Sequence, residues 1–112
     1  MNWRFENGRI YSVDNNNELL AETTFVSIGN REVDIDHTYV SPSLRGQGVA
    51  GKMLEVVAEH LREKGLKARA TCPYANAWLR KHTELYSDII SEKLYGQAIA
   101  CKIDRNNKKV KK

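Results

Sequence analysis

Hydrophobic and polar residues alternate through most of the first forty positions, which is the pattern of strands with one buried face. The alternation predicts strands over residues 9–13, 19–28 and 32–40. A polar D-N-N-N stretch separates the first two strands, and Gly29-Asn30 is a hairpin turn signal before the third. We therefore expect an antiparallel β-meander in this part of the chain.

The third predicted strand has one apolar and one acidic face. Strict alternation places Val33, Ile35 and His37 on one side of the strand and Asp34 and Asp36 on the other. We therefore expect the His37 side chain on the more apolar face.

After residue 48 the spacing of apolar residues changes to that of a helix. The apolar positions are Val49, Met53, Val56, Val57 and Leu61. They predict a helix from about Gly48 to Lys64, which Gly65 ends as a C-terminal cap.

A second β-α pair follows this helix. Residues 67–72 predict a strand, and Pro73 predicts the start of another helix. The element order is then β-β-β, loop, α, β, α. This order predicts an α+β fold, with a mixed, mostly antiparallel sheet and flanking helices.

Length and composition favour one soluble domain. The chain has 112 residues, 41% of them hydrophobic, and no apolar run approaches the length of about 20 residues that spans a bilayer. The sequence shows no signal-peptide pattern near Met1, so we expect a cytoplasmic protein without membrane contact. The two cysteines lie outside any metal-ligand spacing, and we expect no metal.

The positive charge is concentrated at one end of the chain. The net charge is +4, and residues 102–112 alone hold six Lys or Arg and one Asp. The rest of the chain is therefore close to neutral. We interpret this tail as a solvated end, with nucleic-acid binding through the tail as a lesser alternative.

The stretch LRGQGVAGKM, residues 44–53, matches three phosphate-binding patterns. The dinucleotide pattern G-x-G-x-x-G requires a strand directly before its first glycine, but residues 41–45 intervene here. The nucleoside triphosphate pattern requires Ser or Thr after Lys52 to hold Mg²⁺, and Met53 stands there. The residues around the glycines therefore do not fit either of these two patterns.

The third pattern, [RQ]-x-x-G-x-[GA], is formed by Arg45, Gly48 and Ala50 and agrees with its surroundings. A predicted strand, a short loop and a long helix follow one another. Backbone N–H groups at the start of that helix would bind a pyrophosphate, and this mode of binding requires no metal.

The segment VSPSLRGQGVAGKMLEVVAEHLREKGLKARATC resembles the core of the GCN5-related N-acetyltransferase superfamily, in particular its short members. These share a D-H-T-x-V strand before the loop, here residues 36–40, and a T-C pair after the next strand, here Thr71-Cys72. The resemblance covers about residues 5–90. It implies an acyl-CoA N-acyltransferase domain over residues 1–90 and a C-terminal extension over residues 91–112.

The resemblance also implies a co-substrate and its site. Acetyl-CoA would donate an acetyl group to a primary amine of a small molecule or a peptide. Backbone around Tyr39 and Val40 would hold the pantetheine arm and polarise the carbonyl, and Asn76 would contact the same arm. The pyrophosphate would lie on Arg45, Gly46, Gln47, Gly48, Val49 and Ala50.

Two residues are candidates for catalysis. Cys72 would sit at the positive end of the helix that Pro73 opens, which favours the thiolate, so it could accept the acetyl group. It could equally be a small core residue. His37 could deprotonate the amine or the thiol, or it could be a histidine held inside the sheet.

The function prediction has an alternative of a different class. The chain could bind CoA or acyl-CoA without turnover, as a non-catalytic module.

Overall fold

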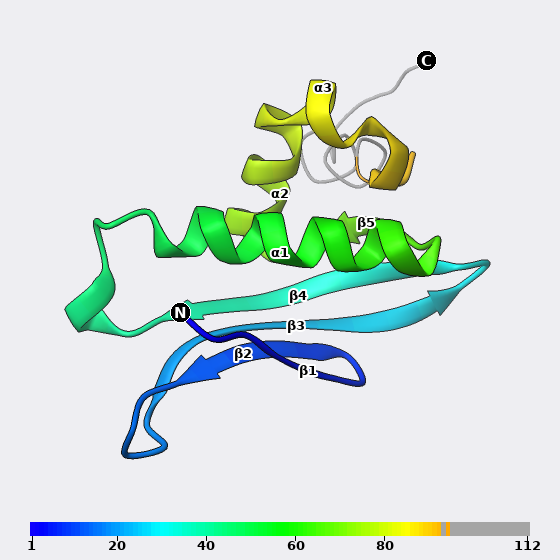
Figure 1. The fold of residues 1–112 in the computed structure, drawn as a ribbon. Helices are drawn as coiled ribbons and strands as arrows, with labels where there is room; N and C mark the ends of the chain where they lie inside the picture. Colours follow the sequence, from blue (N-terminus) through cyan, green and yellow to red (C-terminus); the bar gives the residue numbers. More distant parts are fainter. Residues whose placement is uncertain (93, 95–112) are drawn as a thin grey trace.

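The computed structural model of the chain describes residues 1–92 and 94 (Figure 1). Within these residues, five strands form one sheet in sequence order: β1 (Arg4–Glu6), β2 (Arg9–Val13), β3 (Leu19–Gly29), β4 (Glu32–Val40) and β5 (Lys67–Ala70). β1 to β4 form an antiparallel meander, and β5 pairs with β4 in parallel. The predicted mixed, mostly antiparallel sheet is confirmed.

The helical segments are η1 (Pro42–Leu44), α1 (Val49–Lys64), α2 (Pro73–Lys81), α3 (Thr83–Tyr86) and η2 (Ser87–Ile89). Figure 1 shows α1 lying lengthwise over the sheet, with α2 and α3 on the β5 side of the molecule. One core joins them: Phe25 and Ile35 from the sheet lie in the same buried cluster as Leu54 and Leu61 of α1 and Leu79 of α2. In the described part of the chain, no helix covers the opposite face of the sheet.

The predicted helix boundaries at α1 are confirmed. Gly65 adopts the left-handed conformation with φ 69°, and its N–H donates to the carbonyls of Arg62 and Leu61. The guanidinium of Arg31 donates to the Lys64 carbonyl at 2.7 Å, which binds a third carbonyl of the last turn. The α1 C-terminus is therefore satisfied by the glycine cap together with one side chain from the turn between β3 and β4.

Five elements differ from the prediction. The short strand β1 and the short helical segments η1, α3 and η2 were not predicted. β5 ends at Ala70, two residues before the predicted end. Beyond it, the Thr71 backbone N–H donates to the Asp34 carboxylate at 2.9 Å instead of to a strand partner.

The predicted face of His37 is wrong, because β4 contains a bulge. Ile35 pairs with Phe25 and His37 pairs with Thr24, so Asp36 is an extra residue between them. An extra residue exchanges the faces of all residues beyond it. Phe25 lies in the core under α1, so His37 projects from the opposite face, where its side chain is half exposed.

The packed body extends past residue 90. Leu94 is fully buried, and the Ser91 N–H donates to the Ala68 carbonyl at 2.8 Å. The rest of the predicted C-terminal extension, including the basic tail, lies outside the described residues. Among the described helices, none has the length and apolar character needed to cross a bilayer.

Candidate functional site

The glycine loop between η1 and α1 adopts a conformation that favours glycine. Gly46 and Gly48 have φ of 82° and 78°, in the left-handed region. A Cβ atom at either position would meet no atom within 4 Å. Backbone conformation, and not crowding inside the protein, therefore explains these glycines, and the space in front of the loop is open.

The N-terminus of α1 presents unpaired backbone donors to this space. Gly48 has no side chain to cap the helix, and the first turn contains no acidic residue. The Lys52 N–H donates to the Gly48 carbonyl at 3.1 Å, so the N–H groups of the preceding helical residues have no partner in the helix. Such an end attracts anions.

Two side chains hold the loop against its flanks. The Arg45 Nε donates to the Val40 carbonyl at 3.0 Å, at the end of β4. The Gln47 side-chain amide donates to the Ser43 carbonyl at 3.2 Å. Gln47 therefore acts within the loop, whereas Arg45 joins the loop to the strand that precedes it.

A cleft of about 510 Å³ lies between β4, the loop and α2. Its lining residues are Thr38, Tyr39, Val40, Leu44, Arg45, Gly46, Gly48, Val49, Ala50 and Tyr74. Seven of the nine residues predicted from the sequence to bind the co-substrate lie in this lining. The two that do not are Gln47 and Asn76.

The cleft opens where β4 and β5 separate. Their parallel pairing ends at Ile35 and Ala70, and one further contact follows, from the Cys72 N–H to the Ile35 carbonyl at 3.1 Å. β4 continues to Val40 without β5 beside it. The free edge of β4 can therefore offer backbone hydrogen bonds to an extended ligand.

Cys72 lies beside the inner end of this cleft. It is the N-cap residue of α2, as the sequence predicts, and it is 8% exposed. Its Sγ is 3.4 Å from the Oγ1 of Thr38, which lines the cleft. A thiol in this position is close to any group that reaches the separation of the two strands.

Asn76 binds protein groups. Its Nδ2 donates to the Ala70 carbonyl at 3.0 Å, and its Oδ1 accepts from the Arg80 Nε at 2.9 Å. These contacts fix α2 against the end of β5. Its predicted contact with the pantetheine arm stays a prediction.

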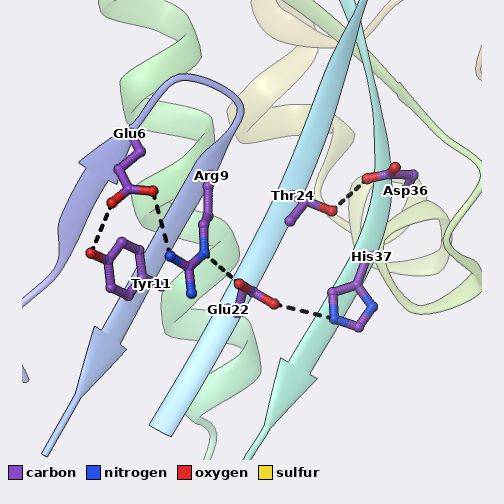
Figure 2. Close-up of polar contacts among 7 residues, drawn as sticks. All are labelled: Glu6, Arg9, Tyr11, Glu22, Thr24, Asp36 and His37. Carbon is purple, nitrogen blue, oxygen red and sulfur yellow. Dashed lines mark hydrogen bonds and ion pairs between the residues drawn. The ribbon is translucent and has the colours of Figure 1, made fainter. Parts of the chain in front are cut away.

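The two predicted catalytic residues do not come together. Cys72 contacts Thr38 on the side of the sheet that faces α1. His37 belongs to a polar group on the other face, where its Nε2 is 3.5 Å from the Glu22 carboxylate (Figure 2). The geometry therefore gives no support to His37 as the base that deprotonates the thiol.

A larger hollow, of about 690 Å³, lies along α1 beside β1. Trp3, Phe5, His60 and Tyr86 contribute its aromatic lining. None of the residues 44–50 takes part in it, so it offers no backbone donors from the glycine loop. We therefore place the candidate site in the smaller cleft.

Three residues of the cleft were missed in the sequence: Thr38, Leu44 and Tyr74. Tyr74 had a usable signal, because it follows Pro73 at the start of a helix next to Cys72. Thr38 belongs to the D-H-T-x-V segment, but its place beside Cys72 depends on the bulge in β4, which strict alternation conceals.

The sheet that opens beside a glycine loop at a helix N-terminus defines the acyl-CoA N-acyltransferase fold. The family model described as GCN5-related N-acetyl-transferase matches residues 9–89. The chain belongs to this family.

Individual relatives agree with this assignment. A GCN5-like putative N-acetyltransferase from Staphylococcus aureus is 40% identical, with a TM-score of 0.67 over 80% of this chain and 87% of that chain. Protein NATD1 of Homo sapiens is 33% identical over 55 residues, 49% of this chain. The match spans about half the length of such curated relatives.

A phosphinothricin acetyltransferase from Sinorhizobium meliloti, solved in complex with AcCoA, has the same fold. It is 19% identical, with a TM-score of 0.50 over 65% of this chain and 44% of that chain.

Proposed function

We propose that this chain is an N-acetyltransferase that takes an acetyl group from acetyl-CoA and transfers it to a primary amine. The observation that carries the proposal is the cleft, in which an uncapped helix N-terminus, a free strand edge and a thiol lie next to one another. These three features suit the pyrophosphate, the pantetheine arm and the thioester, in that order along the ligand.

The donor set of the loop fits a pyrophosphate. The open space in front of Gly46 and Gly48 allows a phosphate to approach the backbone, and the helix dipole favours its charge. Arg45 adds a cation in the lining. Acetyl-CoA as the co-substrate also agrees with the Sinorhizobium relative, which was solved with AcCoA bound.

Two routes of transfer are open to a ligand held in this way. In the first, the Cys72 sulfur attacks the thioester carbonyl, a new S–C bond forms, CoA leaves as the thiol, and the amine then attacks the acetyl-cysteine. In the second, the amine attacks the thioester directly. We propose the first route, because the thiol lies beside the cleft at a helix N-terminus.

Turnover of acetyl-CoA with a panel of primary amines tests the proposed function. We expect CoA release matched by an acetylated amine for at least one class among alkylamines, polyamines and lysine peptides. CoA at a hundred times its Kd should also add about 2.7 kcal/mol to the free energy of unfolding. NAD and ATP–Mg²⁺ are the controls, and we expect neither to stabilise the protein.

The controls separate the alternatives. Stabilisation by CoA without turnover of any amine would favour the non-catalytic binding module. Stabilisation by ATP–Mg²⁺ and not by CoA would contradict both.

A further inference from the structure

A connected group of polar side chains covers the face of the sheet opposite α1 (Figure 2). Glu22 of β3 stands at its centre, between Arg9 of β2 and His37 of β4. At the far end, Glu6 contacts Arg9 at 3.4 Å and accepts a hydrogen bond from the Tyr11 hydroxyl at 3.0 Å. The proposed function leaves Glu22 and Arg9 without a role.

Arg9 fixes the Glu22 carboxylate. Its Nε donates to Glu22 Oε2, and this hydrogen bond raises the pKa of Arg9 above its ordinary value. The guanidinium also lies over the Tyr11 ring, 3.7 Å from the centroid. The Glu22 carboxylate is therefore held on one oxygen, and its other oxygen, Oε1, is the atom that faces His37.

Among the described residues around His37, a second carboxylate is already engaged. Asp36 accepts a hydrogen bond from the Thr24 hydroxyl at 2.6 Å. The Glu22 side chain is 17% exposed, whereas that of His37 is 51% exposed. The pair thus consists of a sheltered carboxylate and an accessible imidazole, which is the arrangement of a base and the group that orients it.

The contact between Glu22 and His37 would favour one tautomer of the imidazole. With Nε2 3.5 Å from Glu22 Oε1, a small rotation allows Nε2–H to donate to the carboxylate. Nδ1 then carries the lone pair and can accept a proton. Contacts of this kind are often long in the absence of substrate.

His37 stands at the edge where the strands separate. The next residue, Thr38, lines the cleft and contacts Cys72 on the other face. An amine that entered the separation of β4 and β5 from the open face of the sheet would pass close to His37.

We propose that Glu22, held by Arg9, is a positioning residue that orients His37 to take a proton from the acceptor amine on this face. The inference rests on the proposed function. His37 Nδ1 accepts one proton from the amine, and the freed lone pair forms the N–C bond to the acetyl carbon. The C–S bond breaks, and its electron pair leaves on sulfur, which takes up the second proton that the amine nitrogen loses as it becomes the amide.

The test compares Glu22→Ala with Glu6→Ala, which removes a carboxylate from the far end of the same group. We expect Glu22→Ala to lower kcat about tenfold and His37→Ala about a hundredfold, with the Kd of acetyl-CoA within about twofold of wild type. Glu6→Ala should keep kcat within about twofold. Glu22→Gln, which retains an oxygen acceptor, should recover part of the rate.

The double variant decides whether the two residues act together. If Glu22 acts through His37, Glu22→Ala combined with His37→Ala is no slower than His37→Ala alone. Additive losses would overturn the proposal, as would equal losses in Glu22→Ala and Glu6→Ala.

Side-chain ¹⁵N NMR of His37 supplies a readout that does not depend on turnover. We expect the Nε2–H tautomer in the wild type and in Glu6→Ala, and its loss in Glu22→Ala. The same tautomer in all three proteins would overturn the role of Glu22. If no amine is acetylated by the wild type, the proposed function fails, and the tautomer still decides separately whether Glu22 orients His37.

Discussion

Replacing Gly48 by valine is expected to lower the affinity for CoA at least about a hundredfold, or about 2.7 kcal/mol. The space in front of Gly48 is open, and the Val side chain would fill the approach to the N-terminus of α1. A β-branched residue at φ 78° is also strained, so we expect the free energy of unfolding to fall by about 1–2 kcal/mol. Calorimetric titration with CoA measures the first effect and denaturant unfolding the second.

Gly51→Ala is the matched control. Gly51 lies inside α1, and its added Cβ would be 3.6 Å from the Trp78 Nε1, an ordinary contact. Since alanine is the better helix former, we expect unchanged CoA affinity and equal or higher stability. Unchanged CoA affinity in Gly48→Val would place the ligand elsewhere.

Incubation with acetyl-CoA in the absence of any amine is expected to place an acetyl group on the peptide that contains Cys72. The thiol lies beside the cleft, so its thiolate can attack the thioester before an acceptor arrives. Intact mass spectrometry followed by peptide mapping detects the adduct. Cys72→Ser should remove it and lower turnover at least about a hundredfold, with CoA affinity close to wild type.

Two further variants separate the alternatives. Cys101→Ser controls for the second thiol and should leave the adduct in place. If the amine attacks the thioester directly, no adduct forms and Cys72→Ala slows turnover only modestly. If Cys72 only fills the core, Cys72→Ala costs about 1 kcal/mol of stability and full activity remains, which would end its catalytic role.

The elements that the sequence predicted correctly are determined by residues that are close to one another in the sequence. The apolar stripe of α1 and the cap at Gly65 each depend on a few consecutive positions. The same holds for the hairpin after β3, although its two turn residues are Asn30 and Arg31, one position later than predicted. β1 has only three residues, all exposed, and so leaves no alternation to detect. Its place depends on pairing with β2, which is a tertiary contact.

The bulge at Asp36 shows most clearly what the alternation of apolar and polar residues does not predict. It arises from the register between β3 and β4, and the local sequence of β4 carries no mark of it. One extra residue moved His37 from the predicted apolar face to the open face of the sheet. The same shift places His37 on the face of Glu22, diagonally across the two strands, a contact between positions 15 residues apart that the sequence alone did not reveal.

The residues of the candidate site also divide into those that a contiguous sequence pattern predicts and those that tertiary packing places there. The loop residues Arg45, Gly46 and Gly48 were predicted because the phosphate-binding pattern is contiguous, and they line the cleft. Tyr74 reaches the same cleft from α2, which depends on how α2 packs. The predicted ligand contact of Asn76 competes with its bond to the Ala70 carbonyl, which could not be foreseen without the end of β5 in place.

Mapping amide chemical shifts in ¹⁵N-labelled protein during titration with acetyl-CoA tests the central claim, that the cleft between β4 and the glycine loop binds this ligand. The account predicts that the largest changes fall on residues 46–50, on Tyr39 and Val40 and on Cys72, and that NAD and ATP–Mg²⁺ leave these signals in place. Changes confined to the hollow lined by Trp3, Phe5 and Tyr86, with the loop signals unmoved, would contradict it.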